Sequence, residues 1–324
     1  MRAAVILGLG CHPKHLRPFQ ENKTQLGQKV EWQMGLPGSS DSVDVILLFG
    51  GDGTIHRHLG PLVQLGLPVL VVPAGSGNDF ARALGVLRMR DSLAAWRKFC
   101  AGAGNVRTID LGVISQIDAG SIGSADLSGR TRTSRAKDAP EIGYRRYFCC
   151  VAGVGLDGEV SRRANQLPRW LRGHGGYLLT LIPTIFRFTP TTMKIYDGCD
   201  EPQRSVNDNG TKWTTASDQP TYLAAFANTP TYGGGMKIAP QAKIDDGLLD
   251  ICVVGAMDLF RLFCMFPTVY AGRHLKIREV RYSQTSRVRV ETESPLDVYA
   301  DGEFVCQTPV EVGIEPAALK VIEL

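Results

Sequence analysis

The stretch Val43-Asp44-Val45-Ile46-Leu47-Leu48-Phe49-Gly50-Gly51-Asp52-Gly53-Thr54-Ile55 joins an apolar run to a cluster of glycines. Residues 43–49 predict a buried β-strand, and residues 55–65 predict a helix that begins directly after the glycines. Glycines let the backbone turn sharply and approach a phosphate, and the N–H groups and dipole at a helix start favour an anion. The stretch therefore predicts a phosphate-binding loop. Its candidate nucleotide ligands are Gly50, Gly51, Asp52, Gly53 and Thr54.

The two polar residues of this loop suit a magnesium nucleotide. Thr54 offers a hydroxyl donor, and the carboxylate of Asp52 can hold a Mg²⁺ ion that bridges phosphate oxygens. The alternative is a plain glycine turn in which Asp52 only caps the helix. We reject a dinucleotide-binding loop at Gly8-Leu9-Gly10, because Pro13 occupies the place of the third glycine.

A second loop of the same kind follows the next predicted strand, residues 68–72. It reads Val72-Pro73-Ala74-Gly75-Ser76-Gly77-Asn78-Asp79-Phe80 and leads into a predicted helix over residues 78–87. Small residues again end a strand and start a helix, and polar side chains crowd the loop. For Asn78, a helix cap and a contact with the nucleotide both stay open. The second loop adds three candidate nucleotide ligands, Ser76, Asn78 and Asp79.

The order of strands and helices predicts two domains. Up to residue 115, three apolar strands alternate with helical patterns, which indicates βαβ units and a parallel sheet. Beyond residue 144 short strands dominate, as in an antiparallel β-sandwich, with helical patterns over residues 176–188 and 256–271. Residues 115–142 and 197–219 are polar and predict loops. The expected fold is an α/β nucleotide-binding domain over residues 1–115 and an all-β or α+β sandwich domain over residues 116–324.

Composition narrows the function classes. The 324 residues carry a formal net charge of +4, which is too small for a nucleic-acid stripe but suits contact with an anionic membrane surface. The eight cysteines show no C-x-x-C pair and no zinc spacing, which predicts reduced, mostly buried thiols. The apolar run in residues 1–8 is too short for a secretory signal, and nowhere do about 18 uninterrupted apolar residues occur. We expect a cytoplasmic protein.

The motifs together resemble one family. Residues 50–54 followed by residues 73–82 are similar to the diacylglycerol kinase catalytic family, which includes bacterial lipid kinases and sphingosine kinases. The resemblance continues through further motifs in the family's order, over about residues 43 to 305. These are Ile109-Asp110-Leu111-Gly112, Ala152-Gly153-Val154-Gly155-Leu156-Asp157, Gly233-Gly234-Gly235-Met236-Lys237-Ile238-Ala239-Pro240, residues 242–250, and Asp301-Gly302-Glu303.

The resemblance implies a fold, a reaction and a set of site residues. It implies an NAD kinase-like nucleotide domain, with ATP and Mg²⁺ in a cleft and a diacylglycerol-like lipid phosphorylated to phosphatidic acid. The Asp301-Gly302-Glu303 triplet implies Glu303 as the catalytic base with Asp301 beside it, although an Asp-Gly hairpin turn is the simpler interpretation of that triplet. A magnesium site is implied at the side chain of Asp246 and the carbonyls of Lys243 and Leu248.

Two departures keep other functions open. The first loop, residues 8–15, lacks the family's Asn-Pro-x-Ser-Gly pattern, and His56-Arg57 stands where a glutamate is common. A catalytically inactive lipid- or nucleotide-binding regulator is therefore one alternative. An NAD kinase is the other, because that family has a similar glycine-rich loop at residues 50–53. The resemblance also implies peripheral contact with the inner face of a membrane, to which the basic residues 130–137 and an apolar helix near Trp170 could contribute. No nucleic-acid partner is expected, and a homodimer is left open.

Overall fold

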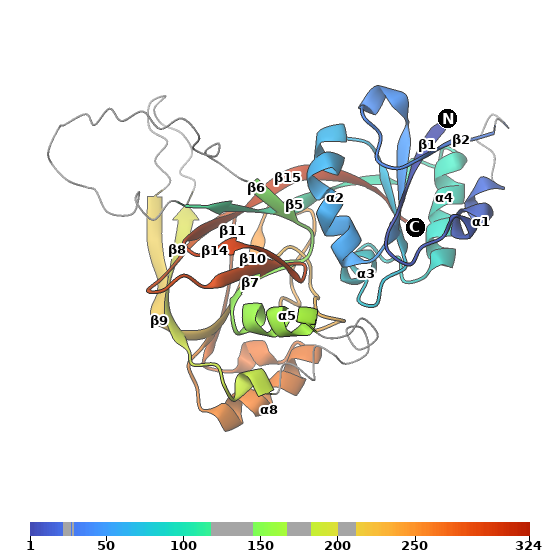
Figure 1. Cartoon of the computed structure of the whole chain (residues 1–324). Coiled ribbons are helices and arrows are strands. Elements are labelled where there is room, and N and C mark those ends of the chain that lie inside the picture. Colours follow the sequence, from blue (N-terminus) through green and yellow to red (C-terminus); the bar gives the residue numbers. More distant parts are fainter. Residues whose placement is uncertain (22–26, 28, 118–144, 167–182, 200–211) are drawn as a thin grey trace, which may run out of the picture.

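The computed structural model describes residues 1–21, 27, 29–117, 145–166, 183–199 and 212–324. The chain forms two lobes, one blue to cyan and the other green to red in Figure 1. One mixed sheet of 15 strands runs through both lobes. Within the described ranges, no helix is both long and apolar enough to cross a bilayer.

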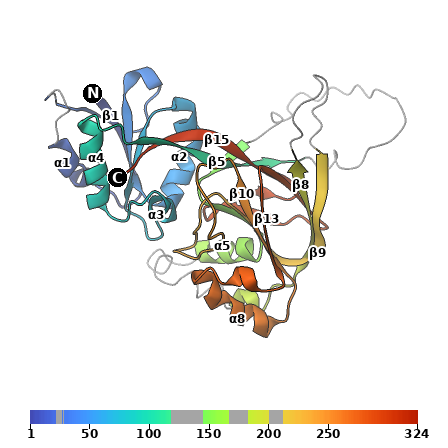
Figure 2. The same ribbon diagram turned by 180° about the vertical axis from the view of Figure 1, so that it is seen from behind.

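The first lobe is a parallel sheet with helices on both faces (Figures 1 and 2). Ile46 and Leu48 pack in the cluster that contains the inner face of the following helix, whereas Leu47 and Phe49 pack with Trp96 on the other side. Burial on both faces explains why this strand is apolar without alternation. The elements of this lobe are β1 (Arg2–Leu7), α1 (Arg17–Gln20), β2 (Glu31–Met34), β3 (Val45–Gly50), α2 (Asp52–Leu65), β4 (Val69–Pro73), α3 (Asp79–Ala83) and α4 (Met89–Cys100). The strands lie in the sheet in the order β2-β1-β3-β4.

Two long antiparallel strands join the lobes. They are β5 (Val106–Gln116) and β15 (Val310–Ile322), and they pair along most of their length. The end of β15 also pairs with β4 of the first lobe, at Val321 and Val69. The last strand of the chain therefore completes the sheet of the first lobe. The expected division after residue 115 stays a prediction, because both joining strands extend into both lobes.

The second lobe is built from antiparallel strands that enclose a core containing Phe148, Phe226, Val288 and Val312. On the outside, α5 and α8 pack against the other face of the sheet (Figure 1). The predicted β-sandwich is confirmed. Its further elements are β6 (Arg145–Phe148), β7 (Val151–Gly155), α5 (Leu156–Gln166), β8 (Thr191–Cys199), β9 (Lys212–Ala227), β10 (Leu249–Gly255), α8 (Leu259–Tyr270), β11 (Val280–Thr285), β12 (Arg287–Thr292), β13 (Asp297–Ala300) and β14 (Glu303–Gln307).

The prediction of a loop over residues 197–219 was wrong at both ends. Strand β8 continues to Cys199, and β9 begins at Lys212 and pairs with it. Residues 214–216 and 218–220 are exposed, so the apolar alternation that indicates a strand is missing there. Pairing of the two backbones forms this part of the sheet, and Ser217 is the one buried side chain among residues 214–220. The basic residues 130–137 and the segment 167–182, which includes Trp170, lie outside the described residues.

Candidate active site

A cleft of about 520 Å³ lies where the two glycine loops meet the second lobe. It brings together most of the residues that the sequence singled out, although they are up to about 250 positions apart in the chain. The first lobe contributes the phosphate loop and the second glycine loop, and the second lobe contributes the turn between β13 and β14. Among the lining residues are Gly51, Asp52, Gly53, Thr54, Arg57, Ser76, Asp79, Asp157, Tyr232, Asp301 and Glu303.

The two glycine loops touch through their backbones. A β-carbon on Gly51 would lie 2.8 Å from Cα of Gly75, and a β-carbon on Gly75 would lie 2.5 Å from Cα of Gly51. Only glycine fits at either position without moving a backbone. Beneath this contact, the side chain of Thr54 fills the space beside Gly8, where a β-carbon would lie 2.5 Å from the Thr54 hydroxyl oxygen. The two loops consequently form one continuous surface at the start of α2.

Asp52 links the phosphate loop to the start of α3. Its two carboxylate oxygens accept the N–H groups of Asp79 and Phe80, each at 3.1 Å. Burial and, to a smaller extent, the negative charge of Asp79 raise the pKa of Asp52 to about 6, against the lowering effect of these two hydrogen bonds. The sequence allowed Asp52 to cap its own helix. Instead its carboxylate accepts the first N–H groups of α3, and Asp52 also lines the cleft.

Of the other residues of the second loop, some hold the loop in place and one is exposed on the cleft wall. Asp79 is buried, accepts the N–H of Gly234 at 2.8 Å and pairs with Arg82, so it ties the second loop to the second lobe. Asn78 adopts a left-handed conformation with φ of 53°, and its amide exchanges two hydrogen bonds with Gly75. Asn78 thus holds the loop and does not line the cleft, whereas Ser76 is exposed on the cleft wall.

Glu303 projects from the turn between β13 and β14 towards the phosphate loop. Its Oε1 would be 2.8 Å from a β-carbon placed on Gly53, so the carboxylate lies directly beside the start of α2. The turn is formed by Asp301 and Gly302, with φ of 50° and 82°. Positive φ at both central residues is typical of a tight hairpin, for which Asp-Gly is favoured. The hairpin interpretation is therefore correct, and the same turn places Glu303 in the cleft.

Asp301 is buried beneath that turn and does not present its carboxylate to the cleft. Its oxygens accept the N–H groups of Cys149 at 2.9 Å and Cys150 at 2.8 Å, and its Oδ2 lies 3.2 Å from Nδ1 of His56. Burial alone would raise the pKa of Asp301, but the hydrogen bond and charge of His56 and the N–H donors outweigh it and lower the pKa. Asp301 is therefore a positioning residue for the turn that carries Glu303.

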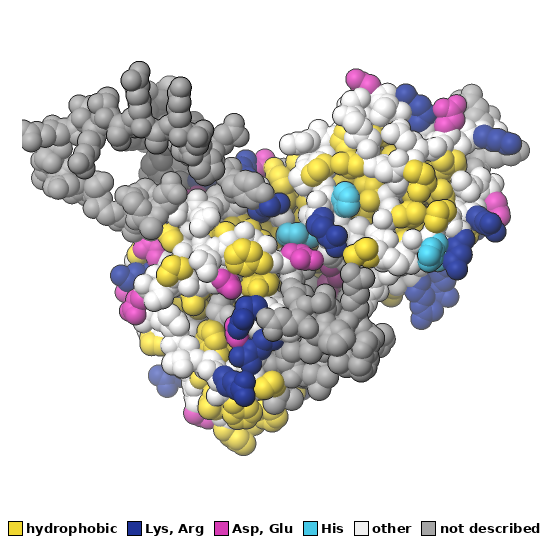
Figure 3. Space-filling view, viewed as in Figure 1, with side chains coloured by type: hydrophobic (Ala, Val, Ile, Leu, Met, Phe, Trp, Pro, Cys, Tyr) yellow, Lys and Arg dark blue, Asp and Glu magenta, His cyan; other side chains and the backbone are white. Residues whose placement is uncertain are grey.

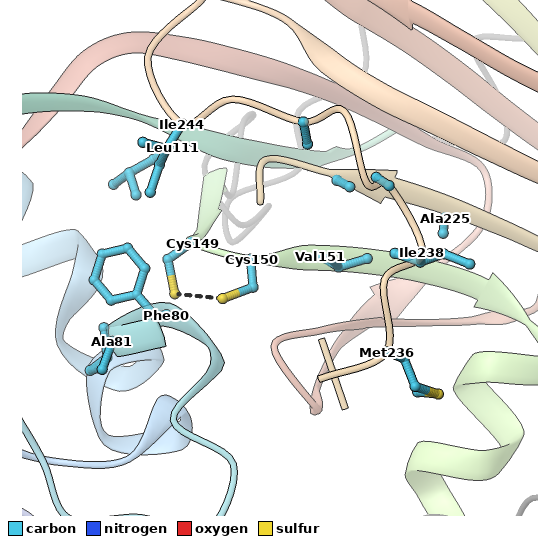
Figure 4. Close-up of a cluster of buried hydrophobic side chains, with 14 of the residues drawn as sticks. Phe80, Ala81, Leu111, Cys149, Cys150, Val151, Ala225, Met236, Ile238 and Ile244 are labelled. Atoms are coloured by element: carbon cyan, nitrogen blue, oxygen red, sulfur yellow. Dashed lines mark hydrogen bonds between the residues drawn. The ribbon is translucent and has the colours of Figure 1, made fainter. Parts of the chain in front are cut away.

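The two adjacent thiols beside Asp301 are packing groups. Figure 4 shows Cys149 and Cys150 next to each other, beside Phe80 of α3. Their sulfur atoms are 4.0 Å apart. Burial raises the pKa of Cys149 well above its ordinary range, which keeps this thiol neutral. All cysteines whose side chains the structure describes are unpaired, as the sequence predicted.

Comparison with known proteins agrees with this geometry. Residues 22–114 match the diacylglycerol kinase catalytic domain, and residues 150–323 match the YegS C-terminal NAD kinase beta sandwich-like domain. A diacylglycerol kinase of Mycobacterium tuberculosis is 31% identical over 280 residues, which cover 86% of this chain and 76% of that protein. The chain belongs to the diacylglycerol kinase family.

Two further relatives of this diacylglycerol kinase family member support its fold and enzyme class. A diacylglycerol kinase of Bacillus subtilis is 26% identical over 271 residues, covering 83% of this chain and 74% of that protein. The crystal structure of a diacylglycerol kinase from Bacillus anthracis superposes with a TM-score of 0.61 at 18% identity, covering 100% of this chain and 96% of the other, and so shares the fold. The predicted family and its class, lipid kinase, are confirmed.

The metal site implied by the family resemblance lies on the loop before β10, apart from the residues that line the cleft. Asp246 is exposed, and its Oδ1 accepts the N–H of Leu248 at 3.2 Å. The neighbouring residues fix this loop, because Asp245 pairs with Arg107 and Gly247 donates its N–H to Asp110 at 2.7 Å. One carboxylate and nearby carbonyls are hard oxygen donors that suit Mg²⁺, which keeps several water ligands. The donor set fits a magnesium ion, and the roles of Lys243, Asp246 and Leu248 stay predictions.

Sequence reasoning missed two residues of the cleft of this family member. Arg57 follows the phosphate loop by one helical turn, donates from Nε to the carbonyl of Gly53 at 3.0 Å, and lines the cleft. Asp157 at the start of α5 lies against Gly153, where a β-carbon would approach its carboxylate to 2.3 Å. The spacing of Arg57 on α2 could have indicated the first, and the glycine-rich run before Asp157 could have indicated the second.

Proposed function

We propose that the protein transfers the γ-phosphoryl group of ATP to the hydroxyl group of a diacylglycerol-like lipid. The products are phosphatidic acid and ADP. The lipid oxygen attacks the γ-phosphorus, the bond between that phosphorus and the bridging oxygen of ADP breaks, and Glu303 accepts the hydroxyl proton. The observation that carries the proposal is the position of the Glu303 carboxylate, which lies beside Gly53 at the start of α2.

The phosphate groups of ATP have suitable partners around that position. The first N–H groups of a helix have no partner within the helix and favour an anion, which assigns the β- and γ-phosphates to the start of α2. Arg57 adds a cation on the same turn, and Ser76 adds a hydroxyl on the opposite wall. Asp52 and Asp79 offer carboxylate oxygens that would hold Mg²⁺, whose chemistry is to neutralise charge on the phosphates. The buried, mutually repelling carboxylates of Asp52 and Asp79 agree with a cation at this place.

A second cavity supports a lipid as the acceptor. It is narrow, about 50 Å³, and its walls are almost entirely apolar. Leu262, Met265 and Phe266 of α8 form one wall, so an outward shift of this helix would widen it for an acyl chain. Asp157 and Tyr232 line both this cavity and the cleft. An acyl chain in the apolar cavity would thus bring its hydroxyl group to the cleft, near Asp157.

The test is transfer of label from γ-labelled ATP to lipids in mixed micelles. Diacylglycerol, ceramide, a sphingoid base and phosphatidylglycerol should be compared, with native protein and with Glu303→Gln. We expect labelled phosphatidic acid from diacylglycerol, and its loss in Glu303→Gln. Glu293→Gln is a matched control, since Glu293 is exposed on the same lobe and does not line the cleft. Measurable ATP binding without transfer to any of these lipids would exclude the kinase and leave the inactive regulator.

A further inference from the structure

Helix α8 is apolar around its whole circumference. Its inner face buries Leu262, Met265 and Val269, and Arg261 is its only charged residue. Helices of this composition are normally covered on every side. Here the outer side is open to solvent. Phe186, which follows Ile185 in the wall of the cavity under α8, is exposed as well. We name as the docking face the exposed side chains Phe186 (58% exposed), Leu259 (38%), Phe260 (76%) and Phe263 (44%).

The docking face is bordered by positive charge. In Figure 3 hydrophobic side chains gather at the lower tip of the molecule, where α8 lies in Figure 1, with Lys and Arg side chains beside them. Residues 257–281 contain five Lys or Arg residues and two acidic residues. Both acidic side chains are engaged by Arg261: Asp258 accepts its backbone N–H at 2.9 Å, and Glu279 accepts two hydrogen bonds from its guanidinium at 2.6 and 3.0 Å. The local excess of positive charge is therefore not balanced within this segment.

A polar cavity of about 510 Å³ adjoins the start of α8. Arg278 and Arg281 line it, together with Gly255 and Ala256 from the connection between β10 and α8. Arg281 is held there by the uncharged Oε1 of Gln219 at 3.1 Å. Glu279 also lines the cavity, but Arg261 neutralises it. Two guanidinium groups in one cavity suit a phosphate, because the planar fork of arginine donates two parallel hydrogen bonds to phosphate oxygens.

We propose that the docking face inserts into an anionic membrane, while Arg278 and Arg281 bind the phosphate of an anionic phospholipid headgroup in the adjacent cavity. Aromatic and aliphatic side chains next to arginines are the combination that holds a helix at a bilayer surface. The inner side of the same helix lines the apolar cavity that meets the cleft at Tyr232. Docking in this orientation places α8 between the bilayer and the apolar cavity. The inference goes beyond the proposed function, because it concerns a surface outside the cleft.

The experiment is flotation of the full chain, without ATP, with vesicles of phosphatidylcholine alone or mixed with phosphatidylglycerol. We expect Phe260→Ser/Phe263→Ser to weaken binding about 10- to 100-fold on mixed vesicles, since two largely exposed aromatic side chains lose their insertion. Arg278→Gln/Arg281→Gln should weaken binding about 20-fold on mixed vesicles and leave the weak binding to phosphatidylcholine unchanged. Thermal unfolding of each variant should match the native protein, because all four side chains are exposed.

Matched controls lie on the first lobe. Leu87→Ser removes an apolar side chain that is 63% exposed, and Arg97→Gln/Lys98→Gln removes two exposed charges. Both should bind like the native protein. The proposal is overturned if the α8 variants bind like the native protein, if the controls lose as much, or if neutral and mixed vesicles bind equally. A dimer that dissociates in Phe260→Ser/Phe263→Ser, without any vesicle binding, would also overturn it and assign the docking face to a second copy.

Discussion

The substitution Gly53→Ala should lower the rate of phosphoryl transfer without lowering the stability of the fold. The added β-carbon would lie 2.8 Å from Oε1 of Glu303 and 4.0 Å from a terminal nitrogen of Arg57. The first distance is too short for a stable contact. Because Oε1 is the free end of a flexible side chain, rotation of Glu303 relieves the clash and the backbone can stay in place. Gly53→Ala should therefore displace the proposed base and leave the fold intact.

Gly53→Ala should change the free energy of unfolding only slightly but should change kcat strongly. Alanine is more favourable than glycine in a helix by up to about 1 kcal/mol, so the free energy of unfolding of Gly53→Ala should be unchanged or slightly higher. A displacement of about 1 Å at a reacting group costs about 100-fold in rate. We expect the kcat of phosphoryl transfer to fall by about two orders of magnitude. If the methyl group also hinders the approach of the phosphates to Gly53, the KM for ATP will rise in addition.

The assay combines label transfer to diacylglycerol at saturating ATP with thermal unfolding of the same preparations. Gly60→Ala is the matched control, since Gly60 lies in the same helix and a β-carbon there has no heavy atom within 4 Å. It should raise stability by about 0.5–1 kcal/mol and keep the native kcat. A native kcat in Gly53→Ala would refute the assignment of Glu303 to this position, and unfolding of Gly53→Ala would refute the claim that the side chain absorbs the clash.

Three further predictions concern carboxylates. The pKa of Asp52 is raised to about 6, so between pH 4 and pH 6 the native state holds a proton that the unfolded state releases. Without Mg²⁺, the free energy of unfolding of the native protein relative to that of Asp52→Asn should therefore fall by up to about 3 kcal/mol from pH 4 to pH 7, and a constant difference in urea unfolding would contradict this. Asp301→Asn should lower the free energy of unfolding by about 3 kcal/mol, because its amide would face N–H donors that the carboxylate accepts, and a loss below about 1 kcal/mol would show that those bonds matter little. Asp246→Ala should reduce the rise in Tm that Mg²⁺ gives to the nucleotide-free protein, and an undiminished rise would place this metal elsewhere.

The strands and glycine loops of the first lobe could be predicted because they depend on residues close together in the sequence. The unbroken apolar run of β3 follows from burial on both faces, and the glycines after it follow from the close approach of Gly51 to Gly75. The helix over residues 78–87 was predicted too long, since α3 ends at Ala83. Phosphate loop, second loop and β-sandwich were therefore within reach of the sequence.

Long-range contacts account for what the sequence did not indicate. Asp301 and Cys149 are 152 positions apart, and no local pattern shows that a buried carboxylate would accept the N–H groups of Cys149 and Cys150. The pairing of Val321 in β15 with Val69 in β4 is likewise a contact between residues far apart in the chain, which no local pattern shows. Asn78 illustrates the opposite case. It stands directly before α3, but its side chain makes no capping bond to that helix and instead bonds to Gly75 three positions earlier, so it fixes the loop.

The most direct test of the central claim is the rate of label transfer to diacylglycerol by Glu303→Gln, measured together with the Kd for ATP. Glutamine keeps the size of the side chain and removes its ability to accept a proton. The account predicts a loss of about 100- to 10,000-fold in kcat with an unchanged Kd, while Glu293→Gln keeps the native rate. A rate for Glu303→Gln within about threefold of the native value would contradict the account, because proton transfer would then need another group.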